Sequence, residues 1–385
     1  MRNTNKKGFT IVELVIVVAV IAILAAVMIP TFAGIIDRAN QSADQQAVAN
    51  MNKLLAMNEK ADDVDGVVEI LVKEGYKGDL STYFKGYQLA WLPSENVIVL
   101  VEDNAVVYPK ANVGATGYEI INPMATDAGA LTGGLTAGDV VYVGGDIAIS
   151  DYLAPGAAGD YAVKLNGNTL NASNIVGSWV DGAKLVVSNG IIDGSSIEGD
   201  DVVVYASKGG SVELNNVQVY APAGYNPIQC YGGTMVLNNV TTAQSGEGHA
   251  TWYNSAIQVI NTIQQVEGKW TLYGEQAKLT VNGGMYTGEK AIQISAPGGN
   301  VTINDGTFVG TMYVIQDDFA PQNYGNNAGY ESVITINGGN FTGAIKLSAT
   351  AKLVINGGTF TVDPTQWVAT GHTVVDNGNG TWTVK

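Results

Sequence analysis

The second half of the chain repeats one short unit, and this repetition constrains the fold more than any other feature. Each copy holds alternating apolar residues, an asparagine, one or two glycines and a closing aromatic residue. The four clearest copies span residues 279–286, 301–308, 334–341 and 353–360. Their asparagines follow one another at steps of 22, 33 and 19 residues, and weaker copies precede them, with asparagines at 215 and 238. A unit of this size cannot bury an apolar face alone, so the copies must stack on one another.

A period near 22 residues predicts a coil of short parallel strands, a parallel β-helix, over residues 139–362. Asn and Gly tolerate the left-handed backbone of a sharp corner, and we expect asparagines of successive turns to hydrogen-bond along the coil. Residues 111–138 are expected to link and start the coil, and residues 363–385 to close it with a capping hairpin. Residues 316–330 are expected to form a loop. A propeller would need a period of about 40 residues or more, and a jelly roll would show no period, so both are weaker alternatives.

Near the beginning of the chain, residues Phe9 to Ile29 form an apolar run whose strongly polar members are Thr10 and Glu13. As a helix this run spans roughly 30 Å, the thickness of the hydrocarbon core of a bilayer. A carboxylate in such a segment costs on the order of 2.5 to 3.5 kcal/mol, so Glu13 needs a compensating partner. The sequence therefore predicts a membrane helix over residues 9–30.

Residues 6–13, Lys-Lys-Gly-Phe-Thr-Ile-Val-Glu, resemble the type III signal of type IV pilins and pseudopilins. The resemblance implies that a prepilin peptidase removes the leader, residues 1–8, by cutting between Gly8 and Phe9, and methylates the amine of Phe9. It also implies that Glu13 pairs with the N-terminal amine of a neighbouring subunit, and Pro30 is expected to bend the helix. A secretory signal or an uncleaved anchor would explain the apolar run but would leave Glu13 unexplained.

Residues 31–110 are expected to form the stem and head of the pilin-like region. Apolar residues recur at helical spacing along the stem, at Phe32, Ile35, Ile36, Ala39, Ala43, Ala47, Met51, Leu54 and Leu55. Asp62 or Asp63 can cap a second, short helix that ends near Gly75. Three apolar runs separated by turn residues predict an antiparallel meander, over residues 87–92, 97–101 and 105–108. The predicted fold class is therefore α+β, with a long N-terminal helix and a small antiparallel meander, followed by an all-β parallel β-helix.

Charge and composition limit the possible partners. The chain has a formal net charge of -16, which repels nucleic acid and anionic lipid. Its single cysteine, Cys230, can form no internal disulfide and is expected to be a small buried side chain. The two histidines, His249 and His372, are far apart in the sequence, so we expect no metal site and no cofactor.

An enzyme is the alternative class, because many polysaccharide lyases and glycoside hydrolases are similar coils. Lyases of the pectate class typically use an arginine or lysine base beside calcium-binding carboxylates, but no arginine follows residue 110 and the lysines are scattered. The adjacent acids Asp200-Asp201 and Asp317-Asp318 are interpreted as solvated surface, with calcium binding by the second pair as a weaker alternative. We therefore predict that the protein is not an enzyme, and keep a membrane-tethered lyase or hydrolase as the alternative.

Aromatic residues are the remaining functional hint in the coil. They lie in stretches predicted to be loops or irregular, at Tyr220, Tyr225, Tyr231, Trp252 and Tyr253. Flat rings on an exposed face can stack against sugar rings, which makes a glycan-binding strip a hypothesis for these residues. The alternative is that the rings pack over the ends or loops of the coil.

Together these features predict a surface-displayed pilin-like subunit whose coil serves adhesion, to glycans, or spacing. A minor or tip position is expected, because a large coil on every subunit would crowd a packed fibre. The expected partners are a prepilin peptidase, other pilin subunits through the N-terminal helix, the membrane before assembly, and glycans. The expected location is the cell membrane first and then an extracellular filament or the cell surface. A pseudopilin-like component of a type II secretion-like system is a further alternative.

Overall fold

The computed structural model describes residues 36, 38–84, 87–122, 124–198, 202–245, 254–266, 269–272, 276–295, 298–317 and 331–385. The predicted leader and membrane helix, with Gly8, Phe9, Glu13 and Pro30, lie outside these residues. Within the described part of the chain, no helix is both long and apolar enough to cross a membrane. The chain divides into two compact units, here called the head unit (Met1–Pro123) and the strand stack (Met124–Lys385).

The head unit packs helices on one face of a four-stranded sheet. One helix covers residues 38–55, and α2 (Val64–Lys73) follows it. The sheet has the order β3-β2-β1-β4 and is built from β1 (Gln88–Leu92), β2 (Val97–Glu102), β3 (Ala105–Tyr108) and β4 (Glu119–Ile120). Two short 3-10 helices complete the unit, η1 (Leu80–Tyr83) and η2 (Lys110–Asn112).

The predicted meander and the second helix are confirmed. Strands β1, β2 and β3 pair antiparallel in chain order. Asp63 is the N-cap of α2, because its side-chain oxygen accepts a hydrogen bond from the backbone N–H of Gly66 at 2.8 Å. The head extends past the expected boundary at residue 110, since β4 pairs antiparallel with β1, with Ile120 opposite Ala90.

The stem helix is bound to the sheet by both apolar and polar contacts. Met51 and Leu55 are fully buried in one core with α2 and the sheet. The Asn52 amide donates to the carbonyl oxygen of Ile98 at 2.8 Å and accepts from the backbone N–H of Ile98 at 2.7 Å. The predicted apolar face is not buried along its whole length: Ile36 is 58% exposed, and Ala39 and Ala43 are exposed as well. The head unit therefore covers only the later part of this face.

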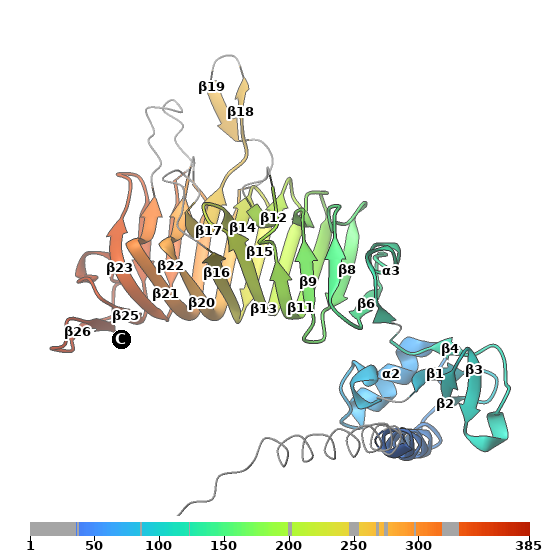
Figure 1. Cartoon of the computed structure of the whole chain (residues 1–385). Coiled ribbons are helices and arrows are strands. Elements are labelled where there is room, and N and C mark those ends of the chain that lie inside the picture. The colour runs from blue at the N-terminus through green and yellow to red at the C-terminus, as the bar shows by residue number, and fades with distance from the viewer. Residues whose placement is uncertain are drawn as a thin grey trace, which may run out of the picture. The chain divides into compact units, whose positions relative to one another are not determined.

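The strand stack consists of parallel strands that lie side by side in three rows, which the chain visits in turn (Figure 1). Five strands are long enough to pass through more than one row: β11 (Ala183–Asp193), β13 (Ser211–Pro222), β20 (Lys278–Ile294), β21 (Asn300–Asp317) and β23 (Asn340–Lys346). The paired residues of neighbouring strands show that each pass of the chain lies next to the pass before it.

Row 1 holds the first parts of β11, β13, β20 and β21 together with β5 (Met124–Ala125), β6 (Val140–Val143), β8 (Gly159–Lys164), β15 (Thr234–Asn238), β22 (Val333–Ile336) and β24 (Lys352–Ile355). Row 2 holds later parts of the same long strands and the start of β23, with β7 (Ile147–Ile149), β9 (Thr169–Ala172), β16 (Val240–Ser245) and β25 (Gly358–Phe360). Row 3 holds the last parts of β20, β21 and β23 with β10 (Val176–Ser178), β12 (Val202–Ser207), β14 (Asn226–Tyr231) and β17 (Ser255–Ile260).

The repeated unit produces two columns along the stack. The expected hydrogen bonds between asparagines are present, each side-chain nitrogen donating to the asparagine one pass earlier at 2.6 to 2.8 Å, through Asn215, Asn238, Asn282, Asn304, Asn337 and Asn356. The closing aromatic residues form a buried column, Tyr286, Phe308, Phe341 and Phe360, with successive ring centroids 5.0, 4.9 and 4.7 Å apart. Equivalent residues of successive units therefore contact one another directly.

Both ends of the stack carry additional elements. Its first strand, β5, pairs with β6, so the stack starts at Met124, within the residues 111–138 that were expected to link and start the coil. A short helix, α3 (Ala128–Gly133), follows β5. At the other end, β26 (Val374–Asp376) and β27 (Trp382–Val384) form an antiparallel hairpin after η4 (Thr365–Trp367), and β27 also pairs antiparallel with β25. A second hairpin, β18 (Ile263–Val266) and β19 (Lys269–Leu272), is inserted after β17.

Candidate functional site

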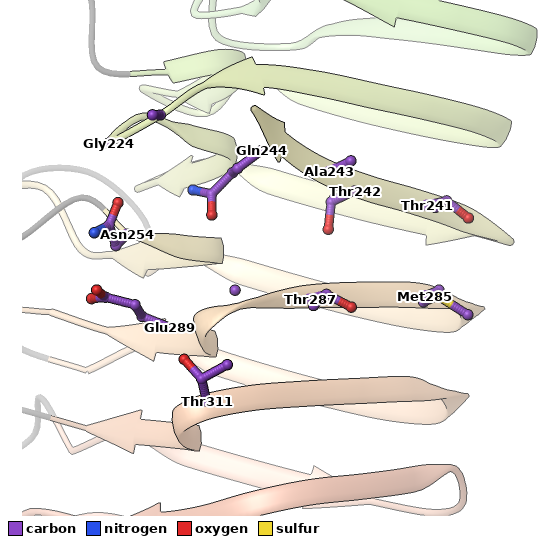
Figure 2. Close-up of a pocket in the computed structure, with 12 residues that line it drawn as sticks. Gly224, Thr241, Thr242, Ala243, Gln244, Asn254, Met285, Thr287, Glu289 and Thr311 are labelled. Atoms are coloured by element: carbon purple, nitrogen blue, oxygen red, sulfur yellow. The ribbon is translucent and has the colours of Figure 1, made fainter. Parts of the chain in front are cut away.

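A groove of about 480 Å³ opens on row 2 between β16 and β20 (Figure 2). The paired residues of these strands run from Val240 opposite Gly284 to Thr242 opposite Tyr286. Beyond Thr242, β16 remains paired with β13 on its other side as far as Ser245. The groove therefore lies where β16 and β20 part.

Seven of the twelve described residues that line the groove carry a polar side chain. Hydroxyl groups come from Thr241, Thr242, Thr287 and Thr311, amide groups from Gln244 and Asn254, and one carboxylate from Glu289. The remaining lining residues are small or apolar: Ala223, Gly224, Ala243, Met285 and Gly288. They come from β16, β20, β21 and the segments that join rows 2 and 3, so residues far apart in the sequence meet here.

Gly288 lets the chain turn at the edge of the groove. A Cβ atom at this position would lie 3.0 Å from the carbonyl oxygen of Lys290 and 3.2 Å from the backbone nitrogen of Ala256. The backbone N–H of Lys290 donates to the carbonyl oxygen of Asn254 at 3.3 Å, which ties β20 to the start of β17. A glycine thus eases the close approach of two chain segments that both line the groove.

Thr242 is the unusual residue of the site. It occupies a column whose other members are apolar and buried, including Val219 before it and Tyr286 after it. Thr242 is 3% exposed, and its hydroxyl has no hydrogen-bond partner among the described residues. A buried unsatisfied hydroxyl costs about 1–3 kcal/mol, so valine would be the more stable choice by this criterion. Figure 2 shows the hydroxyl pointing into the space between β16 and β20.

Two of the predicted ligand-binding tyrosines border the groove. Tyr220 lies opposite Ala243 in the register of β13 and β16. The carbonyl oxygen of Tyr225 accepts a hydrogen bond from the Gln244 side chain at 2.5 Å, which fixes the position of that amide. Trp252 and Tyr253 lie outside the described residues. Sequence reasoning missed the threonines, Gln244 and Glu289, because no local pattern separates them from other surface polar residues.

Tyr231 belongs to a different feature, a row of partly exposed rings beside row 3. Tyr152, Trp179, Tyr205 and Tyr231 follow one another with ring centroids 5.4, 6.5 and 6.2 Å apart. The planes of Tyr205 and Tyr231 differ by 24°, so their faces turn toward each other rather than outward. This geometry favours packing between the rings over stacking on a sugar. A spacing of 26 or 27 residues between these rings was the signal that could have revealed the row.

The loop assignment of these tyrosines was wrong for two of them, since Tyr220 lies in β13 and Tyr231 in β14. Burial alternates along β13 and from Ile228 to Tyr231 in β14, and the two tyrosines occupy half-buried outward positions of this alternation.

Other sequence candidates are placed as follows. Asp317 was expected in solvent but is 2% exposed at the end of β21, where a carboxylate oxygen accepts from the Ser348 hydroxyl at 3.1 Å. Cys230 is buried, and desolvation raises the pKa of its thiol to about 12. Asp200, Asp201, Asp318 and His249 lie outside the described residues. Within the described ranges, no group of three or more His, Cys, Asp and Glu residues is arranged to hold a metal ion.

Comparison with known proteins concerns the N-terminal segment. Residues 3–29 match the family described as the prokaryotic N-terminal methylation motif. The type IV wide pilus major component PilA4 of Thermus thermophilus is 58% identical over 38 residues, which are 10% of this chain and 29% of that protein. The chain thus spans less than a third of the length of this relative. No solved structure matches this chain. The chain therefore carries an N-terminal prepilin methylation motif and is a homologue of a type IV pilin.

Proposed function

We propose that this chain is a subunit of a type IV pilus or of a related surface filament. The observation that carries the proposal is the match of residues 3–29 to the methylation motif. In this proposal a prepilin peptidase cuts between Gly8 and Phe9, the new N-terminus is methylated, and Glu13 pairs with the N-terminal amine of a neighbouring subunit. The exposed Ile36, Ala39 and Ala43 support assembly through the helix, because an apolar stripe of this kind gains stability when a neighbouring helix covers it.

The strand stack is proposed to be a parallel β-helix that the filament displays outside the cell. Its parallel registers and its columns of equivalent asparagines and aromatic residues support this assignment. A stack running from Met124 to Lys385 is larger than the head unit, and its bulk on every subunit would crowd a packed fibre. We therefore propose a minor or tip position, with the stack serving adhesion to glycans.

Binding rather than catalysis is proposed for the groove. Glycoside hydrolysis generally uses two carboxyl groups on either side of the scissile bond. Glu289 is the single carboxylate among the described residues that line the groove, whereas hydroxyl and amide groups are abundant there. This composition suits a site that holds a ligand by hydrogen bonds and releases it chemically unchanged.

The filament proposal is tested on the mature protein and on variants of Glu13. Mass spectrometry of protein extracted from filaments is expected to show an N-terminus at methylated Phe9. Glu13→Ala is expected to be cleaved normally but to be depleted from filaments, because the partner of the N-terminal amine is lost. Glu59→Ala, which changes an exposed carboxylate after the stem helix, is the matched control and is expected to assemble normally. Retention of residues 1–8 in filaments, or normal assembly of Glu13→Ala, would contradict the proposal.

The position of the subunit is tested separately. Gold-labelled antibodies against the strand stack are expected to mark filament tips or sparse sites along the shaft. Uniform dense labelling would assign the chain to the major subunit instead.

A further inference from the structure

The groove between β16 and β20 has the chemistry of a site for an uncharged ligand. Among the described residues that line it, Glu289 carries the one acidic side chain, and none is a lysine or an arginine. An anionic ligand would meet this carboxylate without a cationic side chain from the described lining residues, and the net charge of -16 would repel it further. Uronates, sialylated sugars and phosphates are therefore disfavoured.

The polar groups of the groove match a ligand with many hydroxyl groups. Threonine hydroxyls and the amides of Gln244 and Asn254 can each donate and accept, and the Glu289 carboxylate can accept from two hydroxyls. Met285 is 50% exposed and supplies an apolar surface for the C–H face of a sugar ring. The volume of about 480 Å³ falls within the ~300–1,000 Å³ of small-molecule sites.

Thr242 provides the independent observation that points to a ligand. A hydroxyl that is almost fully buried and has no partner in the described structure faces the groove (Figure 2). The neighbours of Thr242 in its column are Val219 and Tyr286, and neither gives its hydroxyl a hydrogen-bond partner. A ligand hydroxyl that pairs with Thr242 would satisfy this group.

We infer that the groove between β16 and β20 binds an uncharged saccharide through Thr242, Gln244 and Glu289. This inference rests on the adhesive role proposed above and specifies the ligand class and the residues that contact it. Gln244, fixed by its bond to the carbonyl oxygen of Tyr225, is the positioned amide of the site. Glu289 lies on the opposite strand, β20, and is the acceptor for sugar hydroxyls.

The test measures saccharide binding by the purified full chain in detergent micelles. The probes are fluorescent chitohexaose, cellohexaose and mannohexaose as uncharged sugars, and hexagalacturonate as the anionic one. At least one uncharged probe is expected to bind, and hexagalacturonate is not. Thr242→Val is expected to weaken binding about tenfold, the usual effect of one lost hydrogen bond, while leaving thermal stability equal or higher. Thr335→Val, the same change on β22 of row 1, is the matched control and is expected to bind like the natural chain.

The Glu289→Gln variant distinguishes an uncharged ligand from an anionic one. For an uncharged sugar, the change removes a strong acceptor and is expected to weaken binding several-fold. Tighter binding of hexagalacturonate by Glu289→Gln, together with no effect on the uncharged probes, would overturn the inference. Failure of all three uncharged probes to bind, or unchanged binding by Thr242→Val, would overturn it as well. Because Thr242→Val is expected to enter filaments normally, a failure here would leave the filament proposal standing.

Discussion

The side-chain nitrogen of Asn304 donates a hydrogen bond to the side-chain oxygen of Asn282 at 2.6 Å, although 22 residues separate them in the sequence. Asn304 in turn accepts from Asn337 at 2.8 Å, so one side chain links three passes of the chain. Asn304→Ala is expected to lower the free energy of unfolding of the strand stack by about 1–2 kcal/mol, because two partly solvated hydrogen bonds are lost. Urea unfolding followed by circular dichroism measures this change. Asn340→Ala, at an exposed position of β23, is the control; equal losses in both variants would contradict a role for the column.

Gly284 is predicted to tolerate no side chain. Its φ is +108°, and a Cβ atom would lie 2.0 Å from the carbonyl oxygen of Val240 on the neighbouring pass. Gly284→Ala is expected to destabilise the strand stack by at least about 3 kcal/mol, since backbone strain and a backbone clash add together. Gly145→Ala is the matched control, because its Cβ would meet nothing within 4 Å. A thermal melt in which both variants unfold at the same temperature would refute this explanation.

The aromatic column predicts that substitutions of Phe341 destabilise the strand stack more when they remove more side-chain volume. Its ring lies between those of Phe308 and Phe360, with centroids 4.9 and 4.7 Å away. Phe341→Ala is expected to cost about 3–5 kcal/mol through lost burial and a cavity. Phe341→Leu keeps most of the volume and is expected to cost about 1.5 kcal/mol or less. Equilibrium denaturation of the two variants gives these values, and the reverse order would argue against packing as the cause.

The ion pair between Lys184 and Glu213 predicts that the stability of the fold depends on pH. The hydrogen bond from Lys184, whose nitrogen lies 2.7 Å from the carboxylate, holds the pKa of Glu213 below its ordinary value of 4.5. A carboxyl with a lowered pKa in the folded state stabilises the fold above about pH 4.5, and this contribution is lost as the pH falls through the folded pKa. The difference in melting temperature between the natural chain and Lys184→Met is therefore expected to shrink below pH 4.5. Lys208→Met, at an exposed turn, should show no such convergence.

Cys230 is predicted to be unreactive in the native protein. Burial raises the pKa of its thiol to about 12, so almost no thiolate exists at neutral pH and reagents have no access. Iodoacetamide is expected to label Cys230 only after the chain is unfolded in urea, as measured by mass spectrometry. Rapid labelling of the folded chain at pH 7 would show that row 3 opens readily at β14.

The sequence predicted those features that depend on residues close together in the chain or on strict repetition. The meander in the head unit followed from three apolar runs and their turn residues, and the cap of α2 followed from Asp63. The asparagine column followed from the repeated unit, because equivalent residues of stacked units must lie next to one another. The boundary of the head unit could not be found in this way, since two residues of β4 join the sheet through pairing with β1, which no local pattern shows.

The groove depended on tertiary structure alone. Thr242 and Glu289 lie 47 residues apart in the sequence, and they line the same groove only because β16 and β20 stop pairing after Thr242. The unsatisfied hydroxyl of Thr242 likewise has no signature in the sequence, because a threonine in a strand is ordinary until its neighbours in other passes are known. Sequence alone determined the methylation motif and the repeat, which are local or periodic. The tertiary structure decided which polar side chains converge, because that depends on where neighbouring strands separate.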